Sequence, residues 1–207
     1  MLESYYHLAP SRATELRPGA TVHFGRIQNW HYQEMGKRGF GVRSADGQKY
    51  YSMLDVAQDL LAVRFGRARA IGQPLNYHYD AMRCLREVSV AFEHTIKCLR
   101  EEIFEATRLE QFPDLPSRRN CIWLIPDDAA ILAYWKATYV RKENSFRVLR
   151  VRAKGRAHLA DNSLLVPQTS SISQLKQAAE RYWRGELVDP LHQEIVFAGE
   201  VTVVNEI

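Results

Sequence analysis

Cysteine is scarce in this sequence, and its three copies are not spaced for metal binding or for a disulfide framework. Cys84, Cys98 and Cys121 show neither CxxC nor CxxH spacing. Disulfide-dependent secreted domains and zinc modules carry paired cysteines at short, regular intervals. We therefore expect a chain that folds without a metal or a disulfide, inside a reducing compartment.

Long apolar runs and the common nucleotide-binding motifs are also missing. The first residues, MLESYYHLAP, lack a basic segment followed by an apolar one, and no apolar run approaches the roughly 18 residues of a membrane-spanning helix. We therefore expect a cytoplasmic protein with no membrane partner, and the sequence leaves a non-classical secretion route open. No GxxxxGK[ST], GxSxG or HExxH motif occurs, and Gly36, Gly39 and Gly41 do not follow a strand as a dinucleotide-binding turn would.

What is present is typical of one globular domain. The 207 residues are 46% apolar and 25% charged, with a net charge of +4. This mild excess, which includes Arg64, Arg67 and Arg69, is compatible with an anionic ligand or a nucleic acid but requires neither.

Hydrophobic periodicity predicts a single α+β domain over residues 1–207. The longest helix is expected over about 80–111, where apolar residues recur at three- and four-residue spacing, within a helical insertion over about 52–111. Its charges are expected to form a solvated face or to meet a protein partner. Strands are expected in a bent mixed sheet at 5–8, 120–125, 146–152 and 194–204, the last segment as two short strands that bend at Ala198-Gly199, and residues 29–40 are expected to form a loop. Shorter helices are expected after Asp127 or Asp128 and over 173–183.

Several segments, taken in order, resemble the ADP-ribosyltransferase-like superfamily, and more narrowly a poorly characterised bacterial family within it. These segments are SYYHL, FEATRLEQFPDLPSRRNCIWL, AILAYW, FRVLRVRAKGRAHLADNSLL, AERYWRGEL and EIVFAGEVTV. They cover residues 1–20 and 104–205, and PSRRNCIWL is the most specific of them. The resemblance implies a split, strongly bent sheet that holds NAD in a cleft, with no metal.

The resemblance also implies roles for particular residues. His7 would hydrogen-bond a ribose of NAD, and Glu194 would stabilise the positive charge that develops on the nicotinamide ribose; Glu186 and Glu200 are rivals for that role. An aromatic residue would pack on nicotinamide, and the candidates are Trp123, Tyr50 and Tyr51. Arg118 could pair with the pyrophosphate through its planar guanidinium.

The expected activity is therefore cleavage of the nicotinamide–ribose bond of NAD, with transfer of ADP-ribose to a macromolecule, in a toxin, effector or defence protein. The sequence leaves open whether the acceptor is protein or nucleic acid. It also leaves open an NAD glycohydrolase and a non-catalytic binding module on the same fold, the latter because no tyrosine lies in the Cys121-Ile122-Trp123 stretch.

Overall fold

The computed structural model describes residues 3–11, 13–37, 39–43, 50–52, 54–58, 81–140, 146–165 and 171–207. These residues belong to two compact units. One comprises residues 1–33 and 100–207, and the other comprises residues 34–99. Each unit is described by itself.

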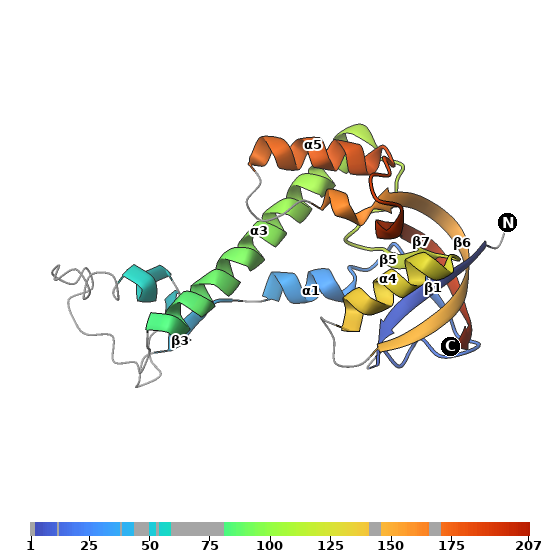
Figure 1. Cartoon of the computed structure of the whole chain (residues 1–207), viewed down its shortest axis with the longest axis horizontal. Coiled ribbons are helices and arrows are strands. Elements are labelled where there is room, and N and C mark those ends of the chain that lie inside the picture. Colours follow the sequence, from blue (N-terminus) through green and yellow to red (C-terminus); the bar gives the residue numbers. More distant parts are fainter. Residues whose placement is uncertain are drawn as a thin grey trace. The chain divides into compact units, whose positions relative to one another are not determined.

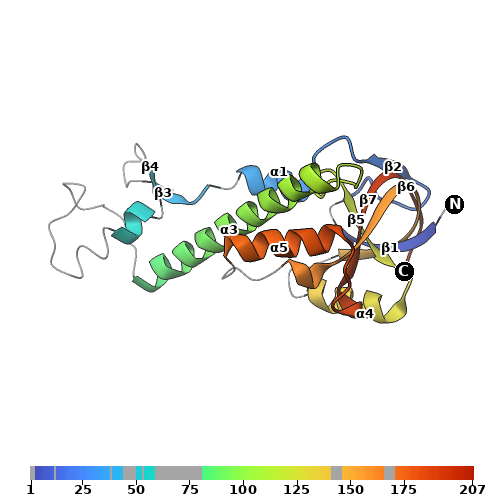
Figure 2. The same cartoon turned by 90° about the horizontal axis from the view of Figure 1, so that it is seen from above.

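A five-stranded antiparallel sheet organises the first unit. Its strands are β1 (Glu3–Pro10), β2 (Thr21–Phe24), β5 (Ile122–Pro126), β6 (Phe146–Asp161) and β7 (Gln193–Glu206). Their spatial order is β2-β7-β5-β1-β6, and β6 also pairs with β7 over most of the length of both strands. The pairings β1–β5, β5–β7, β7–β6 and β6–β1 thus form a closed ring, and both cartoons show the strong curvature of β6 (Figure 1, Figure 2).

Two glycines facing each other allow β6 and β7 to approach closely where they bend. Gly155 lies opposite Gly199. A Cβ at Gly155 would stand 2.3 Å from the Ala198 carbonyl oxygen, and one at Gly199 would stand 2.5 Å from that of Lys154. Gly199 also has a φ of +146°, which other residues rarely adopt. Replacing either glycine would therefore force the two strands apart.

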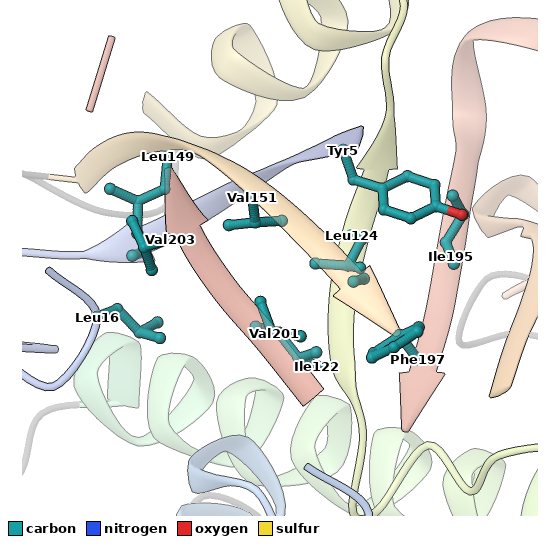
Figure 3. Close-up of a cluster of buried hydrophobic side chains, with 12 residues drawn as sticks. Tyr5, Leu16, Ile122, Leu124, Leu149, Val151, Ile195, Phe197, Val201 and Val203 are labelled. Carbon is teal, nitrogen blue, oxygen red and sulfur yellow. The ribbon is translucent and has the colours of Figure 1, made fainter. Parts of the chain in front are cut away.

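The inner face of the curved sheet encloses the main apolar core. Alternate residues of β1, β5, β6 and β7 supply its side chains, and Leu16 adds one from a loop (Figure 3). The members are Tyr5, Ala9, Leu16, Ile122, Leu124, Leu149, Val151, Ala153, Ile195, Phe197, Val201 and Val203.

Helices cover two parts of the outer face. The helix α4 (Ala129–Val140) packs on the outer side chains of β1, β5 and β6 around Leu8 and Val148. The helix α5 (Ile172–Trp183) and the end of α3 (Ala81–Gln111) pack on the outer face of β7 around Trp183 and Phe104. Short 3-10 helices at Asn162–Leu164 and Pro190–His192 complete this unit.

Side-chain caps explain where these helices begin. The Asp128 carboxylate accepts hydrogen bonds from the first backbone N–H groups of α4, and Ser171 forms a capping box with Gln174 at the start of α5. Gly185, with a φ of +73°, ends the turn after α5. Of the two caps expected for α4, Asp127 or Asp128, it is Asp128 that starts the helix.

The helix α1 (Trp30–Lys37) begins in the first unit and ends in the second. The second unit also contains a hairpin and most of α3. The hairpin pairs β3 (Gly41–Arg43) with β4 (Tyr50–Ser52), and residues 54–58 are helical. Arg64, Arg67 and Arg69 lie outside the described residues.

The α+β class and the positions of the main strands are confirmed, with three corrections. The predicted mixed sheet is wrong, because the described strand pairs are antiparallel. The loop predicted over 29–40 is wrong, because Asn29 accepts a hydrogen bond from the Tyr32 backbone N–H and starts α1. The two short strands predicted over 194–204 form one continuous strand, β7, which bends at Gly199 without ending.

Candidate functional site

A buried cluster of charged side chains lies where β5 and β7 begin. Glu194 is the second residue of β7, and its side chain lies on the outer face because Ala160 and Val196 share that face. Arg118 stands in the turn that leads into β5, Glu101 projects from α3, and Tyr182 projects from α5. Four separate elements therefore bring polar groups to one place inside the first unit.

Arg118 is the centre of this cluster. Its Nε donates to Glu101 Oε2 at 3.0 Å, and its Nη1 donates to Glu194 Oε1 at 2.6 Å and to the Tyr182 hydroxyl. Glu194 accepts two further hydrogen bonds, from the Tyr182 hydroxyl at 2.7 Å and from Asn162 Nδ2 at 2.9 Å. Nη2 of Arg118 has no hydrogen-bond partner among the residues that the structure describes.

The charges of this cluster balance within the chain. Arg100 Nη2 lies 3.0 Å from Glu101 Oε1, so two guanidinium groups face two carboxylates. Burial opposes ionisation of Glu101, but the Arg118 and Arg100 charges outweigh it and lower the pKa of Glu101 to about 2. Burial also opposes the charge on Arg118, yet the neighbouring carboxylates raise its pKa well above the usual value. Glu101 and Arg118 are therefore both ionised at neutral pH, and their charges neutralise each other.

Aromatic rings border the cluster. The Arg118 guanidinium carbon lies 5.6 Å from the centre of the Trp123 ring and 5.1 Å from that of Tyr182, within the range of cation–π attraction. The Trp123 ring meets His31 edge to face, with 5.8 Å between their centres. Its buried indole N–H has no hydrogen-bond partner among the described residues. Tyr32, beside His31, donates its hydroxyl to Glu101.

His7 lies elsewhere. It pairs with Leu149 of β6, a core residue, so its side chain belongs to the inner face of the sheet, whereas Glu194 belongs to the outer face. Its Nδ1 donates a hydrogen bond to the Trp123 carbonyl oxygen at 2.9 Å, where β1 and β5 stop pairing. Burial lowers the pKa of His7 and keeps the ring neutral. His7 thus contacts the backbone of β5 and reaches the cluster only through Trp123.

Of the residues that the sequence singles out, the structure brings Glu194, Arg118 and Trp123 together. Tyr50 and Tyr51 lie on β4, which belongs to the second compact unit. The rival glutamates have other contacts, since Glu186 pairs with Arg181 and Glu200 pairs with His23.

Sequence reasoning missed four members of the cluster: Glu101, Tyr182, Asn162 and Tyr32. Glu101 was assigned to a solvated helix face or a partner interface, and this is wrong, because it is 2% exposed. Glu105 and Arg108 on the same helix are also buried and paired, at 2.8 Å. The sequence did hold a weak signal. Glu101, Glu105 and Arg108 are three or four residues apart, a spacing that places them on the same side of the helix as the apolar Phe104.

Neither a metal site nor a membrane-spanning helix is seen among the described residues. In that part of the chain, no group of three or more His, Cys, Asp or Glu side chains is arranged to hold a metal ion. Burial raises the pKa of the Cys121 thiol, which makes it a poor nucleophile. No helix within the described ranges is long and apolar enough to cross a membrane.

Comparison with known proteins gives a family and no function. No curated protein matches this chain. A family model described as "Protein of unknown function (DUF2441)" matches residues 5–207. The match includes β2, β5, β6 and β7, all of β1 from Tyr5 onward and every residue of the buried cluster, and on this basis the chain belongs to the DUF2441 family.

Proposed function

We propose that this chain is an NAD-dependent ADP-ribosyltransferase whose reaction centre is the outer-face cluster around Glu194. The observation that carries the proposal is the grouping of Glu194, Arg118 and Trp123 at the start of β5 and β7. A carboxylate, a guanidinium and an aromatic ring are the groups to which the resemblance gives roles in this chemistry. The curved sheet, in which β1, β5 and β7 are successive neighbours, supports the proposed type of fold.

Each group has a distinct task in the proposed reaction. The bond between nicotinamide and ribose breaks, its electron pair leaves with nicotinamide, and positive charge develops on the ribose. The Glu194 carboxylate stabilises this charge more strongly in the transition state than in the ground state. A nucleophile of the acceptor then bonds to the ribose carbon and loses its proton to the Glu194 carboxylate.

Arg118 and Trp123 would position the dinucleotide. The guanidinium edge at Nη2 is unused among the described residues and can donate to a pyrophosphate oxygen. The Trp123 ring can pack on nicotinamide, while its unpaired indole N–H offers a hydrogen bond to the ligand. Because the Arg118 and Glu194 side chains are only 6% and 7% exposed, NAD must displace part of their covering to reach them.

In this arrangement His7 acts on the site through β5. Its hydrogen bond to the Trp123 carbonyl oxygen holds β5 in position, and β5 carries the Trp123 ring that is proposed to pack on nicotinamide. Direct contact between His7 and a ribose stays a prediction, as do the roles of Tyr50 and Tyr51, the macromolecular acceptor and the partner of α3.

One observation favours a second candidate, a non-catalytic binding module. Both oxygens of Glu194 are already hydrogen-bonded inside the chain, to Arg118, Tyr182 and Asn162. Such a network can hold β5, β7, α3 and α5 together without any reaction. Under this alternative the cluster stabilises the fold, and NAD is not cleaved.

Release of nicotinamide from NAD distinguishes the two candidates. The wild-type protein and Glu194→Gln would be incubated with NAD and nicotinamide measured by liquid chromatography, with Glu200→Gln, an exposed glutamate on the same strand, as the matched control. Glu194→Gln is expected to lower turnover by about 10²-fold or more, since it removes a charge that acts in the transition state. Radiolabelled ADP-ribose on a macromolecule separates transfer from hydrolysis, and absence of nicotinamide release by the wild type would favour the binding module.

A further inference from the structure

The outer face of β6 carries a row of four cations. Arg150, Arg152, Lys154 and Arg156 occupy alternate positions, so their side chains project from the same face, opposite the core residues Val151 and Ala153. All four are exposed.

The row lies on the part of the outer face between the region covered by α4 and the region covered by α5 and the end of α3. On one side of it, Val148 packs in the apolar cluster of α4. On the other, Ala160 packs in the apolar cluster of α5 and α3. Between them Arg150, Arg152, Lys154 and Arg156 face solvent, whereas His158, next to Ala160 on this face, is buried.

Three of these cations have no carboxylate partner among the described residues. Arg150 pairs with Asp127 at 2.7 Å. Arg156 donates only to the Asp114 backbone carbonyl, at 3.0 Å, and no ion pair joins Arg152 or Lys154 to a described residue. The carboxylate across from Lys154, on Glu200, lies 3.5 Å from His23.

The row ends in a groove of about 750 Å³. Arg156 joins the row of cations to the groove, because it donates a hydrogen bond to Asp114, and Asp114 lines the groove. The walls include the apolar side chains Phe112, Leu115 and Leu159, with His158 stacked on Trp183 behind them and Arg184 at the edge. All these residues belong to the first unit.

We propose that this surface binds single-stranded nucleic acid. Successive phosphates would meet Arg152, Lys154 and Arg156, which stand roughly 6.6 Å apart along the strand. An unpaired base would enter the groove at the end of the row. A cationic track beside a site for the flat face of a base is the usual arrangement of proteins that bind single strands.

The charge row and the groove together favour this partner over two others. A duplex keeps its bases stacked inside, so the groove would stay unused. An acidic peptide could meet the cations but has no flat base for the groove. The inference does not depend on the proposed NAD chemistry, because neither Glu194 nor Arg118 belongs to this surface.

Fluorescence anisotropy with a labelled single-stranded RNA of about 12 nucleotides, within the usual span of such sites, tests the proposal. Three phosphate contacts predict that log K falls against log salt with a slope of about −2. The variant R152Q/K154Q/R156Q should bind on the order of 10- to 100-fold more weakly at 0.1 M salt, with a nearly flat slope. These side chains are exposed, so the variant should keep the wild-type thermal midpoint.

A second triple variant controls for total charge. R86Q/K97Q/K176Q removes the same net charge from exposed helix positions on α3 and α5, and it should bind the RNA as the wild type does. The proposal is overturned if the wild type does not bind, if the two triple variants weaken binding equally, or if a duplex of equal length or polyglutamate binds more tightly than the single strand.

Discussion

Replacing Arg118 by methionine isolates the energetic role of the buried cluster. Methionine fills much of the space of the arginine but leaves Glu101 and Glu194 buried without their shared cation. At separations of 3.0 and 2.6 Å, each attraction is worth about 5–6 kcal/mol before desolvation is subtracted, taking an effective dielectric of about 20. Since the arginine also no longer has to be desolvated, the net loss should be about 3–5 kcal/mol of unfolding free energy.

Urea unfolding followed by tryptophan fluorescence measures this loss. At pH 7 the Arg118→Met midpoint should fall strongly with an unchanged denaturant slope. As the pH is lowered toward 4, the difference from wild type should shrink, because the buried Glu101 carboxylate takes up a proton more readily once the Arg118 charge no longer lowers its pKa.

A charge-balanced variant provides the control. R118M/E101Q/E194Q removes the cation and both carboxylates, so it should recover a large part of the stability lost in Arg118→Met. A loss below about 1 kcal/mol in the single variant, typical of an exposed ion pair, would refute the reasoning. So would a triple variant no more stable than the single one.

Three further predictions follow from other parts of the fold. Because the pKa of Glu101 is lowered to about 2, it should contribute about 3 kcal/mol of stability above pH 4.5 that is lost as the pH falls toward 2; an acid titration of wild type against Glu101→Gln, which lacks this dependence, checks it. Gly199→Ala should cost about 2 kcal/mol or more by thermal unfolding, because its Cβ would meet β6 backbone and its φ is positive, whereas the same change at Gly19, where a Cβ meets nothing within 4 Å, should cost less. Asp161→Asn should speed proteolysis of residues 184–192, since the Asp161 carboxylate accepts the backbone N–H groups of Val188 and Asp189 at 2.6 Å; equal cleavage rates would contradict that role.

The sequence predicted the elements of this fold better than the contacts between them. Strand and helix periodicities located β1, β5, β6, β7, α3 and α5 because those patterns report local burial. The loop error at α1 arose because Asn29 also hydrogen-bonds the carbonyls of Arg118 and Cys121, which are distant in sequence. The antiparallel closure of β6 on β7 likewise depends on pairing across more than 30 residues and on Gly155 meeting Gly199.

The candidate site shows the same limit. The order of the resembling segments along the chain led to the prediction of Glu194, Arg118 and Trp123 as site residues, and the fold places these three together. The same order also selected His7, whose inner-face position follows from a register with Leu149 that no local pattern encodes. Glu101 was misassigned because a charged residue on a long helix usually faces water, whereas the ion pairs with Arg118 and Arg100 make its burial favourable.

The most direct test of the proposed function is nicotinamide release from NAD by the wild-type protein, Glu194→Gln and Glu200→Gln under the same conditions, with folding verified by circular dichroism. The account predicts measurable release by the wild type and by Glu200→Gln, and a loss of about 10²-fold or more in folded Glu194→Gln. Release that is unchanged in Glu194→Gln would contradict the role of this carboxylate, and no release by the wild type would contradict the enzyme.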